Sequence, residues 1–390
     1  MAPESPPQMI RTRKQRVAVV IDTVAPWSVG GRESRYEALL DRFPALGLDV
    51  TVYTMRWWRV PPSGPVRYRA IAPRMKLYKG QRRSILQSVV FAIGTLQLFF
   101  RRFDVIEADH MPYLHLFPLR LVAWVRRVDL VVDWHEYWGQ DYWKRYLGRA
   151  GGVAAALERM SAQMADTVVP VTKELATTLL ELGISPDRIV VVPNAVDRRR
   201  LEAVVPRADA PELLVVGRLL PHKRTELAIR AMAELDPTHR SVRLGIVGEG
   251  PERERLEALA SGLGIQQRVV FYGALARQED VWELMKGARV LVFPSEREGF
   301  GLVAAESQAL GTPVVCIDGP DNKARHLIVD GSTGTLVPTA SPTALAEALT
   351  IWLGDPHERE FVAREFWDVH DDLDWDASAA RYAHLLSRRS

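Results

Sequence analysis

The sequence has a single cysteine, Cys316, so the 390-residue chain cannot form a disulfide within itself. That fits a reducing cytoplasm, although a bacterial surface protein can also lack disulfides. No apolar run reaches the roughly 20 residues that span a bilayer, and the nearest one, residues 85–100, is too short. No Gly-x-Gly-x-x-Gly motif follows a predicted strand, which disfavours a dinucleotide oxidoreductase.

Acidic side chains are missing from residues 51–100, which carry nine basic ones. Residues 1–200 hold 30 Lys and Arg against 19 Asp and Glu, a balance of +11. Residues 201–390 hold 21 against 29, a balance of −8. A basic half indicates an anionic partner, which by charge alone is a phosphorylated acceptor, an anionic membrane surface or nucleic acid.

Short β-branched runs alternate with longer stretches of helical periodicity. The strands predicted in the first half are residues 17–22, 50–54, 105–107, 130–133, 167–171 and 189–192. Those in the second half are residues 212–216, 242–247, 269–272, 290–293 and 313–316. This alternation predicts an α/β protein of two Rossmann-like, doubly wound parallel-sheet domains, with a ligand cleft between them.

Composition also suggests domain boundaries. Residues 1–16 are rich in Pro, Arg and Lys and are predicted to be a disordered basic leader. Residues 198–211 contain arginines, two prolines and no strong period, which is typical of a linker. The linker separates a first domain, residues 17–197, from a second, residues 212–365, and residues 366–390 contain a final helix.

The strongest chemical signal is the segment 294–306, which passes from a strand through a glycine-rich turn into a helix. The helix predicted to begin near Gly301 offers free N–H groups and a positive dipole end, which suit a phosphate. Glu298 lies in the loop before this helix, and Glu306 lies about two turns later. A carboxylate accepts two hydrogen bonds and suits the paired hydroxyls of a ribose. Two glutamates on a solvated face are the alternative interpretation.

Arg218 and Lys223 directly follow another predicted strand, and both can reach one diphosphate. Two fixed cations can neutralise the charge that builds on a leaving phosphate. Gly30 and Gly31 form a further turn after the first strand, where they open a helix or serve as a plain turn. Surface charges are the alternative for the two cations.

This set of residues resembles the signature of the retaining family-4 glycosyltransferases of the GT-B fold. The resemblance covers most of the chain and is densest over residues 215–338. It implies that Glu306 binds the donor ribose and that Arg218 and Lys223 bind the donor diphosphate. The backbone amides implied to assist belong to Gly30, Gly31, Gly301 and Leu302. Glu298 and the backbone of Gly299 and Phe300 are implied to bind hydroxyls of the donor sugar.

His135 occupies the position of the family's active-site histidine, so His135 and Glu298 are the predicted catalytic residues. The resemblance implies retention at the anomeric carbon by front-face attack, in which the leaving phosphate takes the acceptor proton. It implies no metal and no cofactor besides the nucleotide-diphospho-sugar donor. The final helix is implied to cross back to the first domain. The expected acceptor is a carbohydrate, a lipid-linked saccharide or a small molecule, and nucleic acid is not an expected partner.

Several alternatives remain at this stage. Residues 82–102 are either a core helix with solvated arginines at its ends or a segment that gives the basic N-terminal domain peripheral contact with the inner face of a membrane. His135 is either a site residue or a packed core histidine. His110 and His115 lack the spacing of metal ligands on a helix. The rival functions are a nucleotide-sugar epimerase and a non-catalytic nucleotide-sugar-binding protein.

Overall fold

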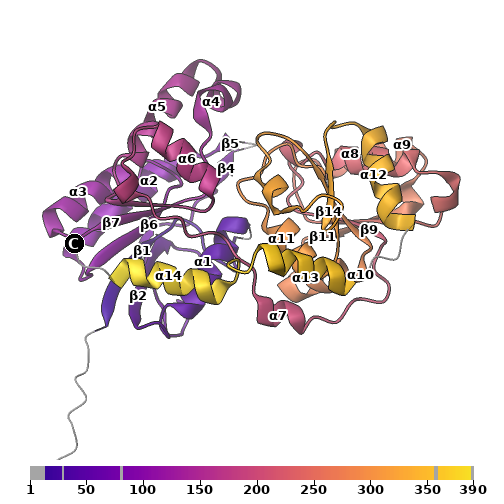
Figure 1. The fold of residues 1–390 in the computed structure, drawn as a ribbon. Helices are drawn as coiled ribbons and strands as arrows, with labels where there is room; N and C mark the ends of the chain where they lie inside the picture. The colour runs from indigo at the N-terminus through magenta and orange to yellow at the C-terminus, as the bar shows by residue number, and fades with distance from the viewer. Residues whose placement is uncertain (1–13, 29, 80–81, 355–358, 388–390) are drawn as a thin grey trace, which may run out of the picture. The chain divides into compact units, whose positions relative to one another are not determined.

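The computed structural model describes residues 14–28, 30–79, 82–354 and 359–387. The chain divides into two compact units. The first consists of residues 1–192 with 379–390, and the second of residues 193–378. Figure 1 shows each unit as a layered α/β body with a sheet at its centre.

The first unit is built on a parallel six-stranded sheet in the order β3-β2-β1-β6-β7-β8. Its strands are β1 (Gln15–Val20), β2 (Leu48–Met55), β3 (Arg67–Ala72), β6 (Val105–Asp109), β7 (Leu130–Trp134) and β8 (Thr167–Pro170). The central strands are buried, as expected for a parallel sheet covered on both faces. A separate antiparallel pair, β4 (Tyr78–Lys79) and β5 (Arg82–Arg83), follows β3.

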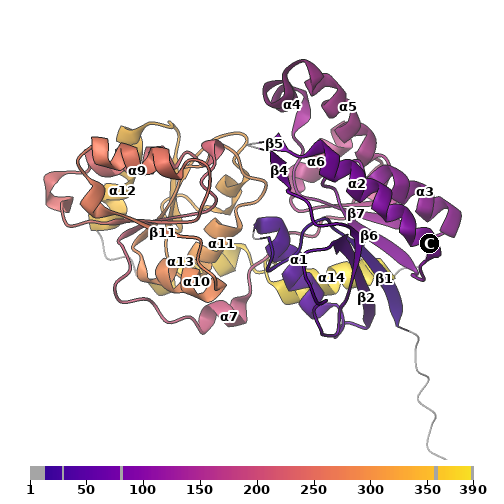
Figure 2. The ribbon, with the colours of Figure 1, turned by 180° about the vertical axis from the view of Figure 1, so that it is seen from behind.

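Helices cover both faces of this sheet. They are α1 (Gly31–Arg42), α2 (Ile85–Thr95), α3 (Leu116–Arg126), α4 (Gly139–Leu147), α5 (Gly151–Ala162), α6 (Lys173–Glu181) and the later part of α14 (Trp375–Ser387). Figures 1 and 2 show α14 beside α1. The edge-on contact between Phe43 and Tyr382, with ring centroids 5.9 Å apart, lies between these two helices. The short 3₁₀ helix η1 (Leu96–Phe100) continues α2.

The second unit repeats the design with a parallel sheet in the order β11-β10-β9-β12-β13-β14. Its strands are β9 (Leu213–Val216), β10 (Leu244–Val247), β11 (Val269–Gly273), β12 (Val290–Phe293), β13 (Val314–Ile317) and β14 (Gly334–Val337). Its helices are α7 (Arg198–Glu202), α8 (Thr225–Glu234), α9 (Arg253–Gly262), α10 (Gln278–Gly287), α11 (Leu302–Ala309), α12 (Pro342–Gly354) and α13 (Arg359–Val369). One apolar cluster joins α8, α9 and α12 to the sheet, and a second joins α10, α11 and α13 to it.

The structure confirms the predicted fold class, since each sheet is parallel, doubly wound and flanked by helices. The strand order reverses between β1 and β6 in the first unit and between β9 and β12 in the second. Sheets of this kind bind ligands at that position. The cleft expected between the domains stays a prediction.

Several predicted elements were wrong or missed. Residues 189–192 form no strand, because only Ile189 makes a single bridge to Val168. The proposed linker, residues 198–211, contains α7, whose N-cap is the side chain of Asp197. Residues 1–13 of the predicted leader lie outside the described residues, whereas Gln15 and Arg16 already belong to β1. The edge strands β3 and β14 were missed.

Candidate functional site

In the second unit the residues of interest lie in the loops that follow β9 and β12, neighbouring strands where the order reverses. Arg218 and Lys223 come from the loop after β9, and Glu298 comes from the loop after β12. Lys223 Nζ donates a hydrogen bond to Glu298 Oε1, forming a partly buried ion pair. Ser295 Oγ donates to the same oxygen at 2.9 Å. The fold therefore joins two motifs that lie 75 positions apart in the chain.

The loop that carries Glu298 is held by a buried asparagine. The amide nitrogen of Asn322 donates to the carbonyl oxygens of Ser295, at 3.1 Å, and Ile317, at 3.0 Å. The backbone N–H of Glu298 donates to the carbonyl of Asp321 at 3.0 Å. Asn322 thus fixes the position of the Glu298 carboxylate by anchoring its backbone, and the sequence offered no signal for this role.

Gly299 and Phe300 form the turn before α11, and the Phe300 side chain packs into the core. Gly301 is the residue that makes the turn possible. Its φ is +96°, and a Cβ there would lie 2.4 Å from the Cβ of Ala324. Only glycine tolerates both conditions. Helix α11 begins at Leu302, directly after this turn, and the binding of an anion by its first N–H groups stays a prediction.

Glu306 lies on α11 and is partly buried. Its Oε1 is 3.5 Å from the amide nitrogen of Gln278, at the start of α10. Burial raises the pKa of Glu306 to about 7. A ligand that donates hydrogen bonds to the ionised carboxylate would therefore lower the pKa of Glu306 and stabilise its charged form.

In the first unit, His135 follows β7 and has 13% of its side chain exposed. Its Nε2 lies 3.4 Å from Asp133 Oδ2 and 3.6 Å from Asp109 Oδ1. Asp109 and Asp133 are directly paired across β6 and β7, and both are fully buried. His110 stacks on His135 with ring centroids 5.5 Å apart. His135 is thus largely buried beside a pair of carboxylates at the strand ends, and its role as a site residue stays a prediction.

Two arginines one turn apart on α1 balance these aspartates. Arg32 Nη1 donates to Asp109 Oδ2 at 2.5 Å, and Arg35 donates to both oxygens of Asp133 at 2.7 and 3.0 Å. Burial opposes ionisation of Asp109, but Arg32, His110 and His135 together outweigh it and hold the pKa of Asp109 far below its usual range. Burial raises the pKa of Asp133, whereas Arg35 and His135 lower it, and the net pKa of Asp133 is lowered.

Gly30 and Gly31 lie at the start of α1, the helix that carries both arginines. A Cβ at Gly30 would lie 2.8 Å from Glu33 Oε2, so the glycine leaves room for a buried glutamate. Thr23 Oγ1 donates to Glu33 Oε1 at 2.5 Å, which ties this turn to the end of β1. The turn predicted from two glycines is therefore part of the same cluster as Asp109 and Arg32.

The fold also brings His110 together with His135 and Asp109. One ligand atom from each lies within 4.8 Å of the others, and the described residues contain no other group of this kind. Sequence spacing missed this group because its members follow different strands. Arg32 already donates to Asp109, so the group is part of an ion-paired network. The absence of a metal requirement stays a prediction.

Comparisons with known proteins identify the family. The profile of the glycosyl transferases group 1 matches residues 197–365, and that of glycosyltransferase family 4 matches residues 29–200. A D-inositol 3-phosphate glycosyltransferase of Thermomonospora curvata is 38% identical over 94% of this chain and 92% of its own. The chain belongs to the family-4 glycosyltransferases.

Other relatives match this family-4 glycosyltransferase over shorter segments. A D-inositol 3-phosphate glycosyltransferase of Acidothermus cellulolyticus is 39% identical over 57% of this chain, which spans about half, 51%, of that protein. A GDP-mannose-dependent α-(1-6)-phosphatidylinositol monomannoside mannosyltransferase of Mycolicibacterium smegmatis is 34% identical over 53% of this chain and 55% of its own.

Solved structures show the same GT-B fold as this family-4 glycosyltransferase. A sucrose-phosphate synthase from Thermosynechococcus elongatus superposes with a TM-score of 0.76 at 22% identity, covering 95% of this chain and 98% of that one. WaaG, a glycosyltransferase involved in lipopolysaccharide biosynthesis, gives 0.75 at 19% identity and covers 96% and 100%. Within the described residues, no helix of this glycosyltransferase has both the length and the apolarity needed to cross a bilayer.

Proposed function

We propose that this glycosyltransferase moves a sugar from a nucleotide-diphospho-sugar to an acceptor hydroxyl, with retained anomeric configuration and without a metal ion. One observation carries the proposal: the ion pair between Lys223 and Glu298 at the point where the strand order of the second sheet reverses. A cation and a carboxylate held side by side there suit a ligand with a phosphate next to a sugar hydroxyl.

The donor would be bound in the second unit. Lys223 and Arg218 supply positive charge for the diphosphate, and the free N–H groups at Gly301 and Leu302 add to it. Donor binding would move Lys223 from Glu298 to the diphosphate. This leaves the carboxylate to accept hydrogen bonds from the sugar. Glu306, further along α11, accepts the ribose hydroxyls.

The reaction breaks the bond between the anomeric carbon and the diphosphate oxygen and forms a bond from that carbon to the acceptor oxygen. The acceptor proton passes to the departing phosphate. Two cations that neutralise the developing negative charge take over the electrostatic role that a metal ion plays elsewhere. His135, beside the ends of β6 and β7, would contact the sugar under transfer, while Gly30 and Gly31 supply backbone amides to the diphosphate.

The acceptor is a carbohydrate, a lipid-linked saccharide or a small molecule. Relatives named for an inositol phosphate and for a phosphatidylinositol mannoside favour an acceptor that carries a phosphate. The +11 balance of residues 1–200 agrees with this choice. We place the enzyme in the cytoplasm, in peripheral contact with the inner face of a membrane.

The experiment has two stages. The wild-type protein is first screened against UDP-, GDP-, ADP- and TDP-sugars, because a ligand that binds only the folded form raises the melting temperature. The binding donor is then incubated with candidate acceptors with and without EDTA, and the anomeric configuration of the product is determined by NMR. We expect a retained configuration and undiminished turnover in EDTA.

Lys223→Ala and Glu306→Ala are expected to lower turnover by about 10²-fold or more, as loss of one charge-stabilising group does elsewhere. Arg255→Ala and Glu257→Ala on α9 are the matched controls, since both remove exposed charges of the same unit. Wild-type turnover in either site variant, or an inverted product, would contradict the proposal. Conversion of the donor without an acceptor would indicate an epimerase instead.

A further inference from the structure

Helix α2 has an apolar side that faces outwards. Its buried side mixes polar and apolar residues and consists of Gln87, Ser88, Phe91, Ala92, Gly94 and Thr95. Its exposed positions, with those of η1, are Ile85, Leu86, Val89, Ile93, Leu96 and Phe100. Ile85 is 68% exposed and Phe100 is 89% exposed. A surface helix normally carries polar side chains on its outer side, so this apolar stripe is suited to an apolar partner.

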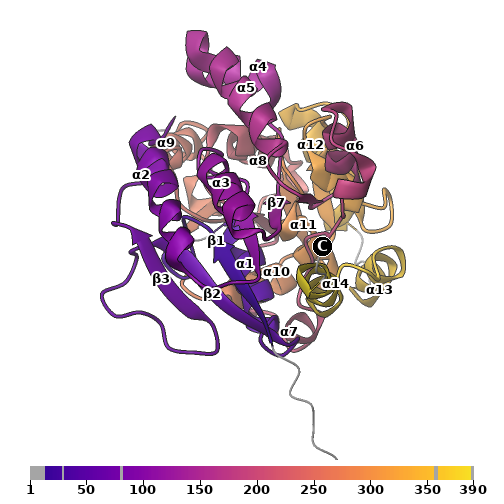
Figure 3. The ribbon, with the colours of Figure 1, turned by 90° about the vertical axis from the view of Figure 1, so that its left-hand side faces the viewer.

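Helix α3 lies beside α2 on the same face of the sheet (Figure 3). It buries Leu116, Leu119, Val122 and Ala123 against the unit, yet Leu121, Trp124 and Val125 are exposed on its other side. Trp124 is 69% exposed. A helix that carries apolar residues on two opposite sides is usually covered on both. The exposed side chains of α2, η1 and α3 are called the α2–α3 face below.

The segments that carry the α2–α3 face hold basic side chains and no acidic one. Residues 51–103 and 110–128 contain no Asp or Glu. Arg102, Arg126 and Arg127 are exposed where η1 and α3 end, next to Phe100 and Trp124. Arg126 Nη1 also donates to the carbonyl of Phe99 at 3.4 Å, which links the ends of the two helices.

A pocket of about 320 Å³ continues this basic region at the edge strand β3. Four arginines line it together with Tyr53, Trp58 and Tyr68; they are Arg56, Arg59, Arg69 and Arg101. No carboxylate lines it, and within the described residues none of the four arginines makes an ion pair. The buried Nε of Arg101 has no hydrogen-bond partner. Because Arg101 directly follows Phe100, this pocket adjoins the α2–α3 face.

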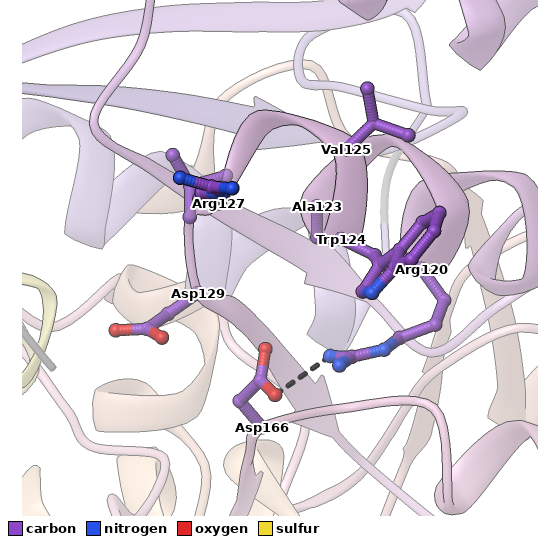
Figure 4. A pocket seen from close by; sticks show the side chains of 8 residues that line it. Arg120, Ala123, Trp124, Val125, Arg127, Asp129 and Asp166 are labelled. Atoms are coloured by element: carbon purple, nitrogen blue, oxygen red, sulfur yellow. Dashed lines mark hydrogen bonds and ion pairs between the residues drawn. The ribbon is translucent and has the colours of Figure 1, made fainter.

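A second hollow shows what a charge-balanced pocket in the same region looks like. It measures about 570 Å³ and lies at the end of α3, between Trp124 and Arg127 (Figure 4). Arg120 donates to Asp166 across it at 2.7 Å, and Asp129 also lines it. The arginine pocket at β3 lacks such carboxylates, so its charge is left for a ligand.

We propose that the α2–α3 face docks on a membrane of anionic phospholipids and that the arginine pocket takes a lipid headgroup phosphate. The exposed Ile, Leu, Phe and Trp side chains enter the boundary between headgroups and acyl chains, where aromatic residues are favoured. The flanking arginines bind phosphates, with Trp58 and Tyr68 packed beside them. This specifies the membrane contact that is part of the proposed function.

A bilayer fits these observations better than a protein. A second copy of the chain would place one basic region against another, and like charges oppose that contact. The segments that form the apolar stripe carry charge of one sign, and the carboxylates of Asp129 and Asp166 line the separate hollow at the end of α3. Such an arrangement suits a surface that is apolar inside and uniformly anionic outside.

The test is sedimentation with vesicles of phosphatidylcholine alone and of phosphatidylcholine mixed with phosphatidylglycerol, without any sugar donor. We expect binding only to the mixed vesicles, and weaker binding as salt rises. Ile93→Ser with Phe100→Ser is expected to abolish binding. Arg59→Gln with Arg69→Gln is expected to weaken it roughly thirtyfold. All four positions are exposed, so the melting temperature should not change.

Arg230→Gln with Arg240→Gln removes two exposed charges from the second unit and is expected to leave vesicle binding unchanged. Two results would overturn the proposal. One is equal sedimentation of the wild type and the Ile93→Ser, Phe100→Ser variant. The other is no vesicle binding while inorganic phosphate or glycerol phosphate stabilises the wild type but not the Arg59→Gln, Arg69→Gln variant, which would assign the pocket to a soluble anion. Because no donor is present, failure here leaves the proposed glycosyl transfer untouched.

Discussion

Arg35 holds Asp133 through two parallel hydrogen bonds, from Nε to Oδ2 at 2.7 Å and from Nη2 to Oδ1 at 3.0 Å, with both side chains fully buried. The same guanidinium donates to the carbonyl of Val192 at 3.0 Å and lies over the ring of Tyr382. The Arg35 side chain therefore connects the carboxylate beside His135 to Val192, where the first segment of this unit ends, and to helix α14.

Replacing Arg35 by Met should destabilise the protein by about 3–5 kcal/mol, because it leaves Asp133 charged and buried without a partner. Urea unfolding measures the loss. The matched control is Arg67→Met, which breaks the largely exposed pair with Asp49 and should cost at most about 1 kcal/mol. Adding Asp133→Leu to Arg35→Met should recover much of the stability, since no buried charge then remains. A loss as small as that of the control would contradict the buried geometry.

Glu107 should make the protein less stable as pH rises. Its Oε1 accepts hydrogen bonds from Tyr36 at 2.6 Å and Tyr382 at 2.9 Å, and burial raises the pKa of Glu107 to about 8. An unfolded glutamate titrates near ~4.3. Between these two pKa values the folded state holds a proton on Glu107 that the unfolded state has lost. The free energy of unfolding is therefore highest below the unfolded pKa and falls as pH rises towards the folded pKa, by up to about 1.4 kcal/mol per pH unit.

Melting temperatures of wild type and Glu107→Gln, measured between the two pKa values, test this expectation. The variant cannot ionise and should lose part of the pH dependence. Glu181→Gln, at an exposed carboxylate on α6, should behave as wild type. Parallel curves for all three proteins would show that Glu107 does not titrate in this way.

Nucleotide binding should strengthen as pH rises through 7. The pKa of Glu306 is raised to about 7 by burial, so the free enzyme holds this carboxyl group largely protonated below that pH. The ionised form offers both oxygens as charged acceptors to the two ribose hydroxyls, whereas the protonated form has one oxygen that donates instead. The affinity should therefore change by up to about tenfold per pH unit below 7 and level off above it.

Calorimetric titration with the nucleotide that the screen selects, over a range of pH, measures this dependence. Glu306→Gln should bind weakly at every pH, with a flatter profile. Glu257→Gln on α9 should reproduce the wild-type curve. A wild-type affinity that does not vary around pH 7 would remove Glu306 from the proposed nucleotide site.

Gly301→Ala should lower the free energy of unfolding by more than a positive φ alone explains. The left-handed conformation costs a non-glycine residue roughly 1–2 kcal/mol, and the new methyl group would also meet Ala324 at 2.4 Å. Gly331→Ala is the matched control, since Gly331 has a φ of +79° and no atom within 4 Å of its would-be Cβ. Unfolding measurements should show a larger loss for Gly301→Ala, which should also lose nucleotide binding. Equal losses would mean that the turn before α11 can yield.

Local signals were sufficient where the chemistry lies within one strand, turn and helix. The segment around β12 and α11 carries its own glycines and carboxylates, so Glu298, Gly301 and Glu306 were named from the sequence. The same holds for the alternation of strands and helices that gave the fold class. The edge strand β3, Arg67–Ala72, was missed because its polar, half-exposed pattern differs from that of a buried central strand.

The sequence by itself determined the repeated α/β alternation and the glycine turns, because these depend on backbone conformation and on side-chain periodicity over a few residues. Tertiary structure alone decided that Arg32 and Arg35 face Asp109 and Asp133, that Lys223 pairs with Glu298, and that Ile85, Leu86 and Ile93 of α2 point outwards. Parallel sheets bring together strand ends that are far apart in the chain. Which side of a helix faces solvent is decided only when its other side packs against the sheet.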